Sequence, residues 1–456
     1  MGWLRKISLS KTALVIIFVV CGLNIYSQVN RPKLLNIIEW DVQEYYMYLP
    51  AAFIYNDLGF EFVPQLPDSL QKHYWLKKSD IGKNIGRFSG GMAITYTPFF
   101  LLGHGIAKVF GFPQNGFSFP YQLGIFISGF CYSFIGYIFL RRILLRYFND
   151  LATALTLICI SLGTNLFYYT TTEGPMSHAS LFCLFTLFLY FTIKWHEKPA
   201  YRTMAMLFSV AALAVVIRPI SVMLAVFFLL YNISGKNTLP GKIKFYLAHY
   251  KHFLLGFSVA LLVALPQLVY WKTYGGQWLY YSYGNERFFF NDPQIINGLF
   301  GYRKGWLVYT PVMILSLCGF FFLRRRTPEV FFPILIYVIL HIYVIFSWWC
   351  WWYGGSFGMR AMIEAYALLA LPFAALWQYL WLKLKPAFFL AIAFSVFCIY
   401  LNGVQSLQYR QVIIHWDSMN KAYYWAVFNK LSWPDEQTRS LLVAPDYEGA
   451  MAGKRD

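Results

Sequence analysis

The chain has 456 residues, of which 58% are hydrophobic, 21% aromatic and only 13% charged. Soluble globular chains carry about 25% charged residues, so this composition excludes an ordinary soluble domain and indicates a membrane protein. A formal net charge of +18 would suggest nucleic acid as a partner for a soluble protein, so the placement of the basic residues has to be examined first.

The N-terminal segment combines Arg5, Lys6 and Lys11 with an apolar run from about residue 12 to residue 26. This pattern resembles a secretory signal peptide, but no small-x-small cleavage site follows it. We therefore expect an uncleaved membrane anchor.

Ten further apolar runs follow, and several are shorter than the roughly 20 residues that a span usually needs. They lie at about 119–140, 151–170, 178–193, 203–217, 220–233, 253–271, 305–323, 330–347, 362–382 and 386–403. The sequence predicts an all-α polytopic membrane protein with about eleven transmembrane helices. We divide it into a transmembrane domain, 1–403, and a short extracytoplasmic tail, 404–456.

The basic residues predict the orientation of these spans. With the N-terminus in the cytoplasm and eleven alternating spans, the inner loops hold eighteen Lys and Arg residues against three acidic residues. The outer segments, with twenty basic and seventeen acidic residues, are nearly balanced. This positive-inside pattern accounts for the net charge, so we expect contact with membrane lipids and none with nucleic acid.

Two features follow from the same alternation. The apolar run 92–112 cannot span, because most later basic loops would then lie outside, so we expect an interfacial helix within a long first outer loop, about 29–118. The run 203–233 has to reverse direction, and Pro219, directly after Arg218, supplies the break.

The first candidate site follows the anchor and reads E-W-D-V-Q-E-Y-Y-M-Y-L-P from Glu39 to Pro50. Helical spacing sets Asp41 one turn before Tyr45, with Glu44 and Tyr46 beside them. Carboxylates and tyrosines just outside a membrane suit a general base beside a sugar-stacking wall. Interfacial tyrosines in a solvated loop are the alternative interpretation.

The second candidate site is the glycine-rich stretch 354–359, followed by Arg360 and by Glu364 at the start of a span. Exposed N–H groups before a helix and a guanidinium group both suit a phosphate. A simple pairing of Arg360 with Glu364 one turn later is the alternative.

Four further basic residues of the outer segments are candidates for substrate binding, with snorkelling to lipid headgroups as the alternative for each. They are Lys83, Arg87, Arg303 and Lys304. The tryptophans between 348 and 352 indicate an interfacial aromatic belt more than a sugar platform.

The seven cysteines stand singly and the eight histidines form no H-E-x-x-H, so we expect neither a metal site nor a cofactor. Apart from Arg218 and His341, the spans carry almost no ionisable residue, which disfavours ion-coupled transport.

The whole arrangement resembles the GT-C superfamily of polytopic glycosyltransferases, which includes the protein mannosyltransferases and the aminoarabinose transferases of lipid A. The stretches that carry the resemblance are Asp41–Pro50, Tyr96–Pro98, Gly163–Asn165, Arg218-Pro219 and Gly354–Glu364. The resemblance implies an enzyme of the bacterial inner membrane that transfers a sugar, with inversion, from a polyprenyl-phosphate carrier to an acceptor hydroxyl on the extracytoplasmic face.

The resemblance also implies roles for particular residues. Asp41 corresponds to the catalytic base, and Arg360 is the first candidate for holding the lipid phosphate. Many members have a second acid directly after the first, where this chain has Val42, so Glu44 remains an alternative base. The chain lacks the large outer C-terminal domain of some relatives, which leaves the acceptor open. An O-antigen ligase or polymerase, or a transporter of lipid-linked saccharides, is the alternative function.

Overall fold

The structure is a computed structural model that describes residues 8–29, 36–233 and 238–454. Arg5 and Lys6 of the expected anchor, part of the first outer loop (30–35) and part of an expected inner loop (234–237) lie outside the described residues. Helices make up most of the described chain, and its one sheet pairs β1 (Lys77–Lys78) with β2 (Asn84–Ile85). The all-α expectation is confirmed.

Six helices of the described chain are long and apolar enough to cross a membrane. They are α1 (Leu9–Val29), α6 (Phe119–Tyr147), α9 (Ser177–Glu197), α13 (Tyr250–Tyr270) with its π-helical extension η4 (Trp271–Gly275), α17 (Pro328–Ser347) and α19 (Lys385–Arg410). The chain is therefore a multi-pass helical membrane protein by its fold and composition.

The other five expected spans form helices that are shorter or less apolar, so the count of eleven stays a prediction. These helices are α7 (Asp150–Leu162) with α8 (Leu166–Thr171), α10 (Tyr201–Ile217), η3 (Pro219–Met223) with α11 (Leu224–Leu230), α15 (Trp306–Tyr309) with α16 (Met313–Arg326), and α18 (Tyr366–Lys383).

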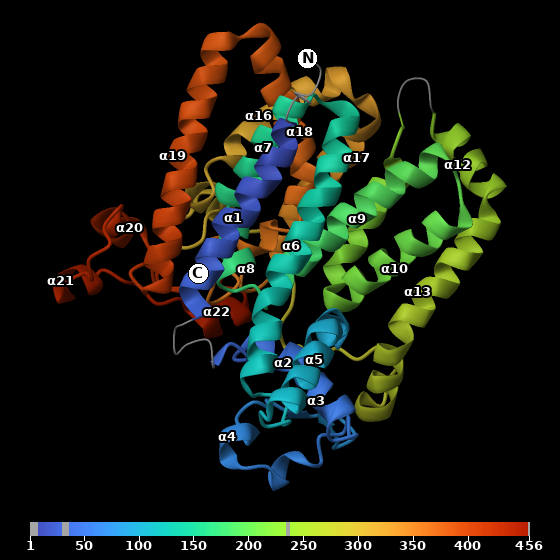
Figure 1. The fold of residues 1–456 in the computed structure, drawn as a ribbon, viewed down its shortest axis with the longest axis vertical. Coiled ribbons are helices and arrows are strands. Elements are labelled where there is room, and N and C mark those ends of the chain that lie inside the picture. The colour runs from blue at the N-terminus through green and yellow to red at the C-terminus, as the bar shows by residue number, and fades with distance from the viewer. Residues whose placement is uncertain (1–7, 30–35, 234–237, 455–456) are drawn as a thin grey trace.

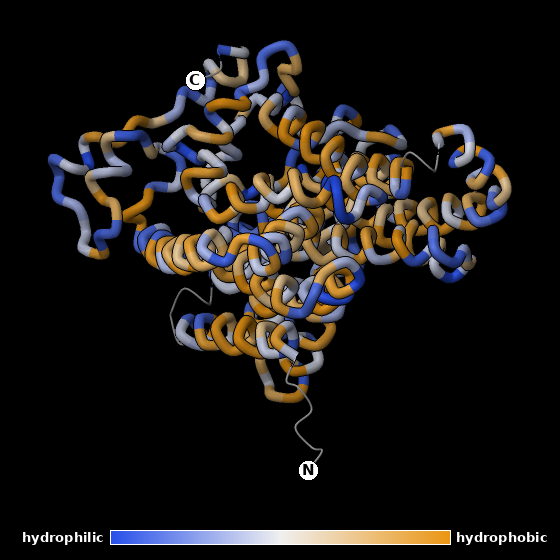
Figure 2. Tube along the Cα trace, turned by 90° about the horizontal axis from the view of Figure 1, so that it is seen from above, coloured by the Kyte–Doolittle hydropathy of each residue, from blue (hydrophilic) through white to orange (hydrophobic). Residues whose placement is uncertain are grey.

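The helices at the rim of the bundle expose large apolar side chains outward. Leu23 on α1, Leu262 on α13 and Leu390 on α19 are 64%, 67% and 72% exposed. Seen from above, apolar residues cover the outside of the bundle as well as its interior (Figure 2). A soluble protein rarely exposes so continuous an apolar surface, whereas lipid tails suit it.

Helix α18 forms the centre of the bundle, and nearly all of its residues are buried. It packs on α16, α7 and α9. Gly319 of α16 permits the closest approach, because a Cβ there would lie 1.9 Å from the carbonyl oxygen of Pro372 in α18. A helix that is apolar all round belongs in such an interior position, and it gives the site a rigid support.

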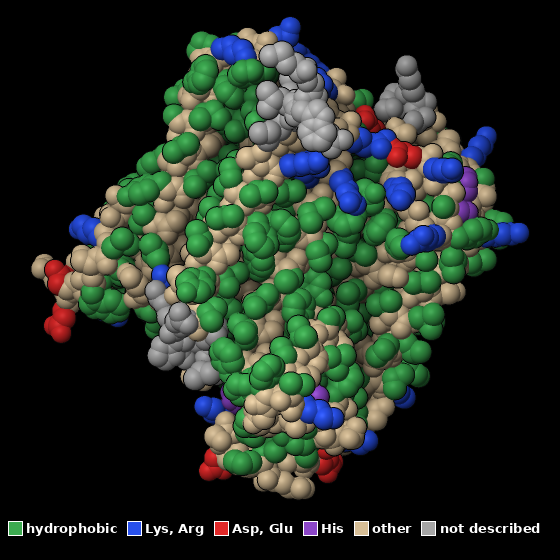
Figure 3. Space-filling model, in the orientation of Figure 1, with side chains coloured by type: hydrophobic (Ala, Val, Ile, Leu, Met, Phe, Trp, Pro, Cys, Tyr) green, Lys and Arg blue, Asp and Glu red, His purple; other side chains and the backbone are tan. Residues whose placement is uncertain are grey.

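The helix ends next to the expected inner loops gather at one end of the molecule. Lys and Arg side chains are prominent at this end, at the top of Figure 3. Contacts that join these ends include Ser10 with Asp150, Asn149 N–H with the Gln378 side-chain oxygen at 2.7 Å, and Asn232 N–H with the Glu329 carbonyl at 2.8 Å.

The expected reversal at Arg218 is confirmed. Helix α10 ends at Ile217 and the 3-10 turn η3 begins at Pro219. At the far end of the second leg, the ring of Tyr231 lies 4.9 Å from that of His196, next to the start of α10. The chain therefore goes out along α10, turns at Arg218 and returns along α11.

The opposite end of the molecule carries the first outer loop (Figure 1). Its helices are α2 (Asp41–Tyr46), α3 (Tyr48–Phe53), the 3-10 turn η2 (Val63–Gln65), α4 (Asp68–Gln71) and α5 (Gly91–Phe110). Helix α5 covers the run expected to be interfacial, and it packs on α2, α3 and α6.

The remaining helices are short or lie in the tail. They are α12 (Leu239–Ala248), α14 (Ile295–Phe300), the 3-10 turn η5 (Arg360–Met362), α20 (Lys421–Val427), α21 (Glu436–Arg439) and α22 (Tyr447–Ala452).

Candidate functional site

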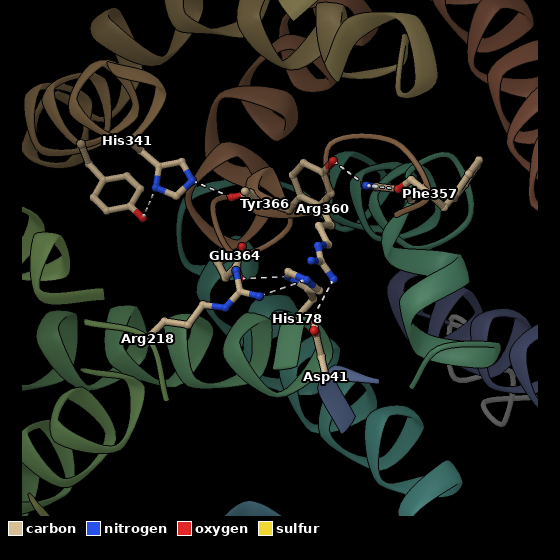
Figure 4. Close-up of polar contacts among 11 residues, drawn as sticks. Asp41, His178, Arg218, His341, Phe357, Arg360, Glu364 and Tyr366 are labelled. Carbon is tan, nitrogen blue, oxygen red and sulfur yellow. Dashed lines mark hydrogen bonds and ion pairs between the residues drawn. The ribbon is translucent and has the colours of Figure 1, made fainter. Parts of the chain in front are cut away.

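The two stretches singled out in the sequence meet in space. The Arg360 guanidinium donates from Nη1 to Oδ2 of Asp41 at 3.2 Å, across 319 positions of sequence. Figure 4 shows Arg360 pointing from the loop before α18 toward Asp41. Arg360 contacts Asp41, whereas sequence spacing alone would pair it with Glu364.

The Arg360 side chain is 14% exposed and that of Asp41 is 32% exposed. Burial alone would lower the pKa of Arg360, but the Asp41 carboxylate and nearby tyrosines raise it above its ordinary value. Nε of Arg360 is buried and has no hydrogen-bond partner within the described chain. The guanidinium group is therefore charged, held from one side, and retains donor capacity for an anion.

The loop that carries Arg360 is fixed by other parts of the protein. Asn165, from the motif Gly163–Asn165, donates to the Phe357 carbonyl at 3.3 Å and accepts from the Tyr366 hydroxyl at 2.7 Å. Gly358 has a φ of 57°, a conformation that favours glycine, and a Cβ there would lie 3.1 Å from Cβ of Tyr309.

Backbone N–H groups of this loop are directed inward. The N–H of Ser356 donates to the Trp416 carbonyl at 3.2 Å, and that of Phe357 donates to the Tyr169 hydroxyl at 3.0 Å. The helix after the glycines is the three-residue η5. These two N–H groups are therefore occupied within the protein, and no long helix follows the glycines directly.

Lys304 supports the same loop from beneath. Its side chain is buried, its Nζ donates to the Ser356 carbonyl, and it lies 5.6 Å from the centre of the Tyr409 ring. Burial lowers the pKa of Lys304 to about 7. Lys304 therefore positions the loop that carries Arg360.

A second guanidinium group lies beside the first. Arg218, at the reversal between α10 and η3, contacts Glu364 at 3.6 Å and His178 at 3.3 Å. His178 in turn lies 3.1 Å from Glu364. Figure 4 shows Arg218 and Arg360 extending toward the same region from different elements. Glu364 and His178 hold Arg218 in place.

The two neighbouring tyrosines of α2 have different surroundings. The centre of the Tyr45 ring lies 4.7 Å from that of Phe88, and burial raises the pKa of the Tyr45 hydroxyl while Arg218 opposes the rise. The Tyr46 hydroxyl donates to the Gly116 carbonyl inside the first outer loop. Asp41, Arg218, Arg360 and Glu364 form a charged cluster. Tyr45 therefore lies next to this cluster, whereas Tyr46 is a core residue that faces away from it.

Glu44 is nearly buried, at 5% exposure. Burial raises its pKa to about 7, with Arg87 opposing the rise and Asp41 adding to it. Its Oε2 has no hydrogen-bond partner among the described residues. Arg87 itself forms an ion pair with Glu286 and lies over the Tyr283 ring at 5.3 Å.

Two of the expected binding residues have contacts elsewhere. Lys83 donates to the Thr273 carbonyl at 3.2 Å and lies over the Tyr274 ring, next to the turn between β1 and β2. Arg303 lies 5.2 Å from the centre of the Trp352 ring. The structure brings together Asp41, Tyr45, Arg360 and Glu364, with Glu44 and Arg87 next to them.

The sequence did not predict site roles for His178, Arg218 and Glu286. Arg218 could have been recognised from the sequence, since it is one of very few ionisable residues in the apolar runs and precedes the expected break. Nothing in the sequence pointed to His178, because its partner Glu364 lies 186 positions away.

No group of three or more His, Cys, Asp or Glu side chains in the described residues is arranged to hold a metal ion. A comparison of the sequence with protein-family models finds no match, and a comparison with curated proteins finds none at a significant level. The chain is a multi-pass helical membrane protein with a charged cluster at the end opposite its basic loops.

Proposed function

We propose that the protein is an inverting glycosyltransferase of the GT-C type that uses a polyprenyl-phosphate sugar as donor. The single observation that carries the proposal is the contact of Asp41 with Arg360. It sets a carboxylate next to a guanidinium group with free donor capacity, at the end of the molecule away from the basic loops. An inverting transfer needs both groups, a base for the acceptor and a cation for the leaving phosphate.

The chemistry assigned to these groups is a single displacement. The acceptor hydroxyl oxygen forms a bond to the anomeric carbon while the bond from that carbon to the phosphate oxygen breaks. The electron pair of the broken bond stays on the phosphate, where Arg360 and Arg218 stabilise the added charge. The acceptor proton passes to the Asp41 carboxylate, which requires that Arg360 turn from Asp41 toward the phosphate.

Tyr45 and Tyr283 would complete the donor side. Tyr45 is buried beside Arg218 and Asp41, and Tyr283 contacts Phe88, the aromatic neighbour of Tyr45. Aromatic rings with a polar hydroxyl suit the mixed apolar and hydroxylated faces of a sugar.

Glu44 is the second candidate for the base, and one observation favours it. Its pKa of about 7 matches the ideal for a general base at neutral pH. Asp41 remains the first choice because it is more exposed and contacts Arg360 directly.

We assign the basic end to the cytoplasm of a bacterial inner membrane and the charged cluster to the extracytoplasmic face, with eleven spans. The grouping of basic side chains at one end supports this orientation by the positive-inside rule. The apolar surface of α5 near the cluster would let a lipid tail stay in the bilayer while its phosphate reaches Arg360.

The test is a donor assay with the purified full chain in nanodiscs. Labelled polyprenyl-monophosphate sugars, together with diphosphate-linked oligosaccharides, are incubated with a cell-envelope extract as acceptor. We expect consumption of at least one monophosphate sugar and a product with the opposite anomeric configuration. Consumption of only diphosphate-linked donors would favour the ligase alternative, and retention of configuration or no consumption would refute the proposal.

A further inference from the structure

A cavity of about 940 Å³ lies beside the cluster, between the segment 281–290 and helix α22 of the tail. Its volume is close to the upper end of the 300–1,000 Å³ typical of ligand sites. None of the expected donor contacts at Arg360 or Arg218 lines it. The cavity is an open depression distinct from these contacts, and its lining indicates what it binds.

One wall of the cavity is aromatic. Phe288 and Phe290 are nearly parallel, with ring centres 5.3 Å apart and an angle of 6° between the planes. Tyr281 and Tyr447 also line it, and the exposed fractions of Tyr281 and Phe290 are 57% and 47%. Partly exposed aromatic rings are the kind of surface on which the C–H side of a sugar ring packs.

Polar and charged residues share the lining with these rings and with Gly284, Met451 and Ala452. Asn285, Glu286, Arg287 and Glu448 contribute an amide, two carboxylates and a guanidinium group. Glu286 is held in position, because Oε2 accepts from the Trp349 indole at 2.9 Å and Oε1 pairs with Arg87. Fixed acceptors and donors next to aromatic faces match the hydroxyl groups of a carbohydrate better than an acyl chain.

The cavity is connected to the Asp41 cluster by short contacts. Arg87 pairs with the cavity residue Glu286 and also lies over Tyr283. The Tyr283 ring is 6.0 Å from Phe88, and Phe88 is 4.7 Å from Tyr45 of α2. These contacts link the wall of the cavity to α2, the helix that carries Asp41.

We propose that this cavity binds an oligosaccharide chain, and that its terminal hydroxyl is the acceptor. Glycan binding stands on the cavity alone, whereas the acceptor role rests on the proposed transferase function. The tail then has a defined task, since α22 supplies Tyr447 and Glu448 to the glycan site.

Two pairs of variants test the glycan site. Phe290→Ala is matched with Phe300→Ala, because Phe300 is 53% exposed in the same outer segment and does not line the cavity. Glu448→Gln is matched with Glu436→Gln, because both glutamates lie in the first turn of a short tail helix and only Glu448 lines the cavity.

The readout is binding of the full-length protein in nanodiscs to an array of bacterial cell-surface oligosaccharides. We expect wild type to bind members of the array, and Phe290→Ala and Glu448→Gln to weaken binding by roughly tenfold, while both controls bind like wild type. Glu448→Gln is conservative and lies at the surface, so it keeps the test valid if Phe290→Ala fails to fold.

Two results would overturn the inference. The first is a wild-type protein that binds no glycan on the array, or pairs of variants that do not differ. The second is an equal loss of thermal stability in nanodiscs for Phe290→Ala and Phe300→Ala with unchanged glycan binding, which would identify the aromatic wall as a membrane-interface belt.

A kinetic measurement separates this inference from the proposed function. Phe290→Ala should raise KM for the acceptor and leave KM for the donor unchanged. A protein that binds glycans but consumes no polyprenyl-phosphate sugar would refute the transferase proposal alone. A protein that transfers sugar with no glycan binding at the cavity would refute the glycan site alone.

Discussion

At the scale of single residues, the contact between Asp41 and Arg360 joins a partly exposed carboxylate to a mostly buried guanidinium group. A mostly buried guanidinium group needs a partner for its charge, and Asp41 supplies one. The proposed transfer requires in addition that both groups react, which substitutions at each position test.

Arg360→Lys tests whether the planar guanidinium group is needed. Lysine keeps the charge but loses the paired N–H donors that match phosphate oxygens. We expect kcat/KM for the donor to fall by roughly tenfold or more, measured as initial rates of donor consumption. Turnover equal to wild type would assign Arg360 to Asp41 pairing alone.

Glu44 makes stability depend on pH. Its folded-state pKa of about 7 lies above its ordinary value, so the folded protein retains a proton that the unfolded chain has released. Stability should therefore fall as pH rises from about 5 through about 7. Glu44→Gln should reduce this fall, which thermal unfolding in detergent across that range would measure. Identical pH dependence in both proteins would contradict the buried setting of Glu44.

At the scale of elements, the site lies on loops whose buried side is supported by residues of the helical bundle and its connecting segments. Asn165 and Lys304 contact the backbone of the Arg360 loop on its buried side. Because α18 and α16 are packed tightly beneath it, a change at a buried support is expected to move Arg360 rather than unfold the bundle.

Lys304→Met removes the support while keeping an unbranched side chain of nearly the same length. The Ser356 carbonyl loses its donor, and displacement of the loop by about 1 Å can reduce turnover by on the order of 10²-fold. We expect such a loss in donor consumption with normal expression. Lys421→Met, at the exposed start of α20, is the control. Equal activity of the two variants would show that Lys304 does not position the loop.

The sequence predicted the positions of most long helices, but it could not predict contacts between distant segments. The placement of the basic loops and Pro219 together predicted the reversal at Arg218, because a proline breaks a helix locally. Spacing could suggest an Arg360–Glu364 pair but not the Arg360–Asp41 contact, which depends on packing between distant segments. The pairing of His178 with Glu364 and the cavity at α22 were invisible for the same reason.

At the scale of the whole molecule, the distribution of charge predicts how the chain is oriented in the membrane. Basic side chains gather at the end where the chain reverses between α6 and α7, α9 and α10, and α16 and α17. The six long apolar helices are those of a membrane protein. Because the other expected spans form shorter or less apolar helices, the number of eleven crossings stays a prediction.

Cysteine labelling tests the orientation in a variant without native cysteines. An impermeant reagent added from outside should reach cysteines at positions 80 and 295, and should not reach cysteines at positions 145 and 245. Those positions are Asp80, Ile295, Leu145 and Phe245. Labelling at 245 from outside would reverse the assignment of the long basic loop and with it the eleven-span topology.

The transfer rate of Asp41→Asn, compared with wild type on the donor that wild type consumes, tests the central claim most directly. Asparagine retains the size of Asp41 and an oxygen that accepts from Arg360, but it cannot take the acceptor proton. We predict a loss of about 10²- to 10⁴-fold in turnover with donor binding retained, and Glu44→Gln as the matched variant should keep most of its activity. Wild-type turnover in Asp41→Asn would contradict the assignment of Asp41 as the base, and a simultaneous loss in Glu44→Gln would move that role to Glu44.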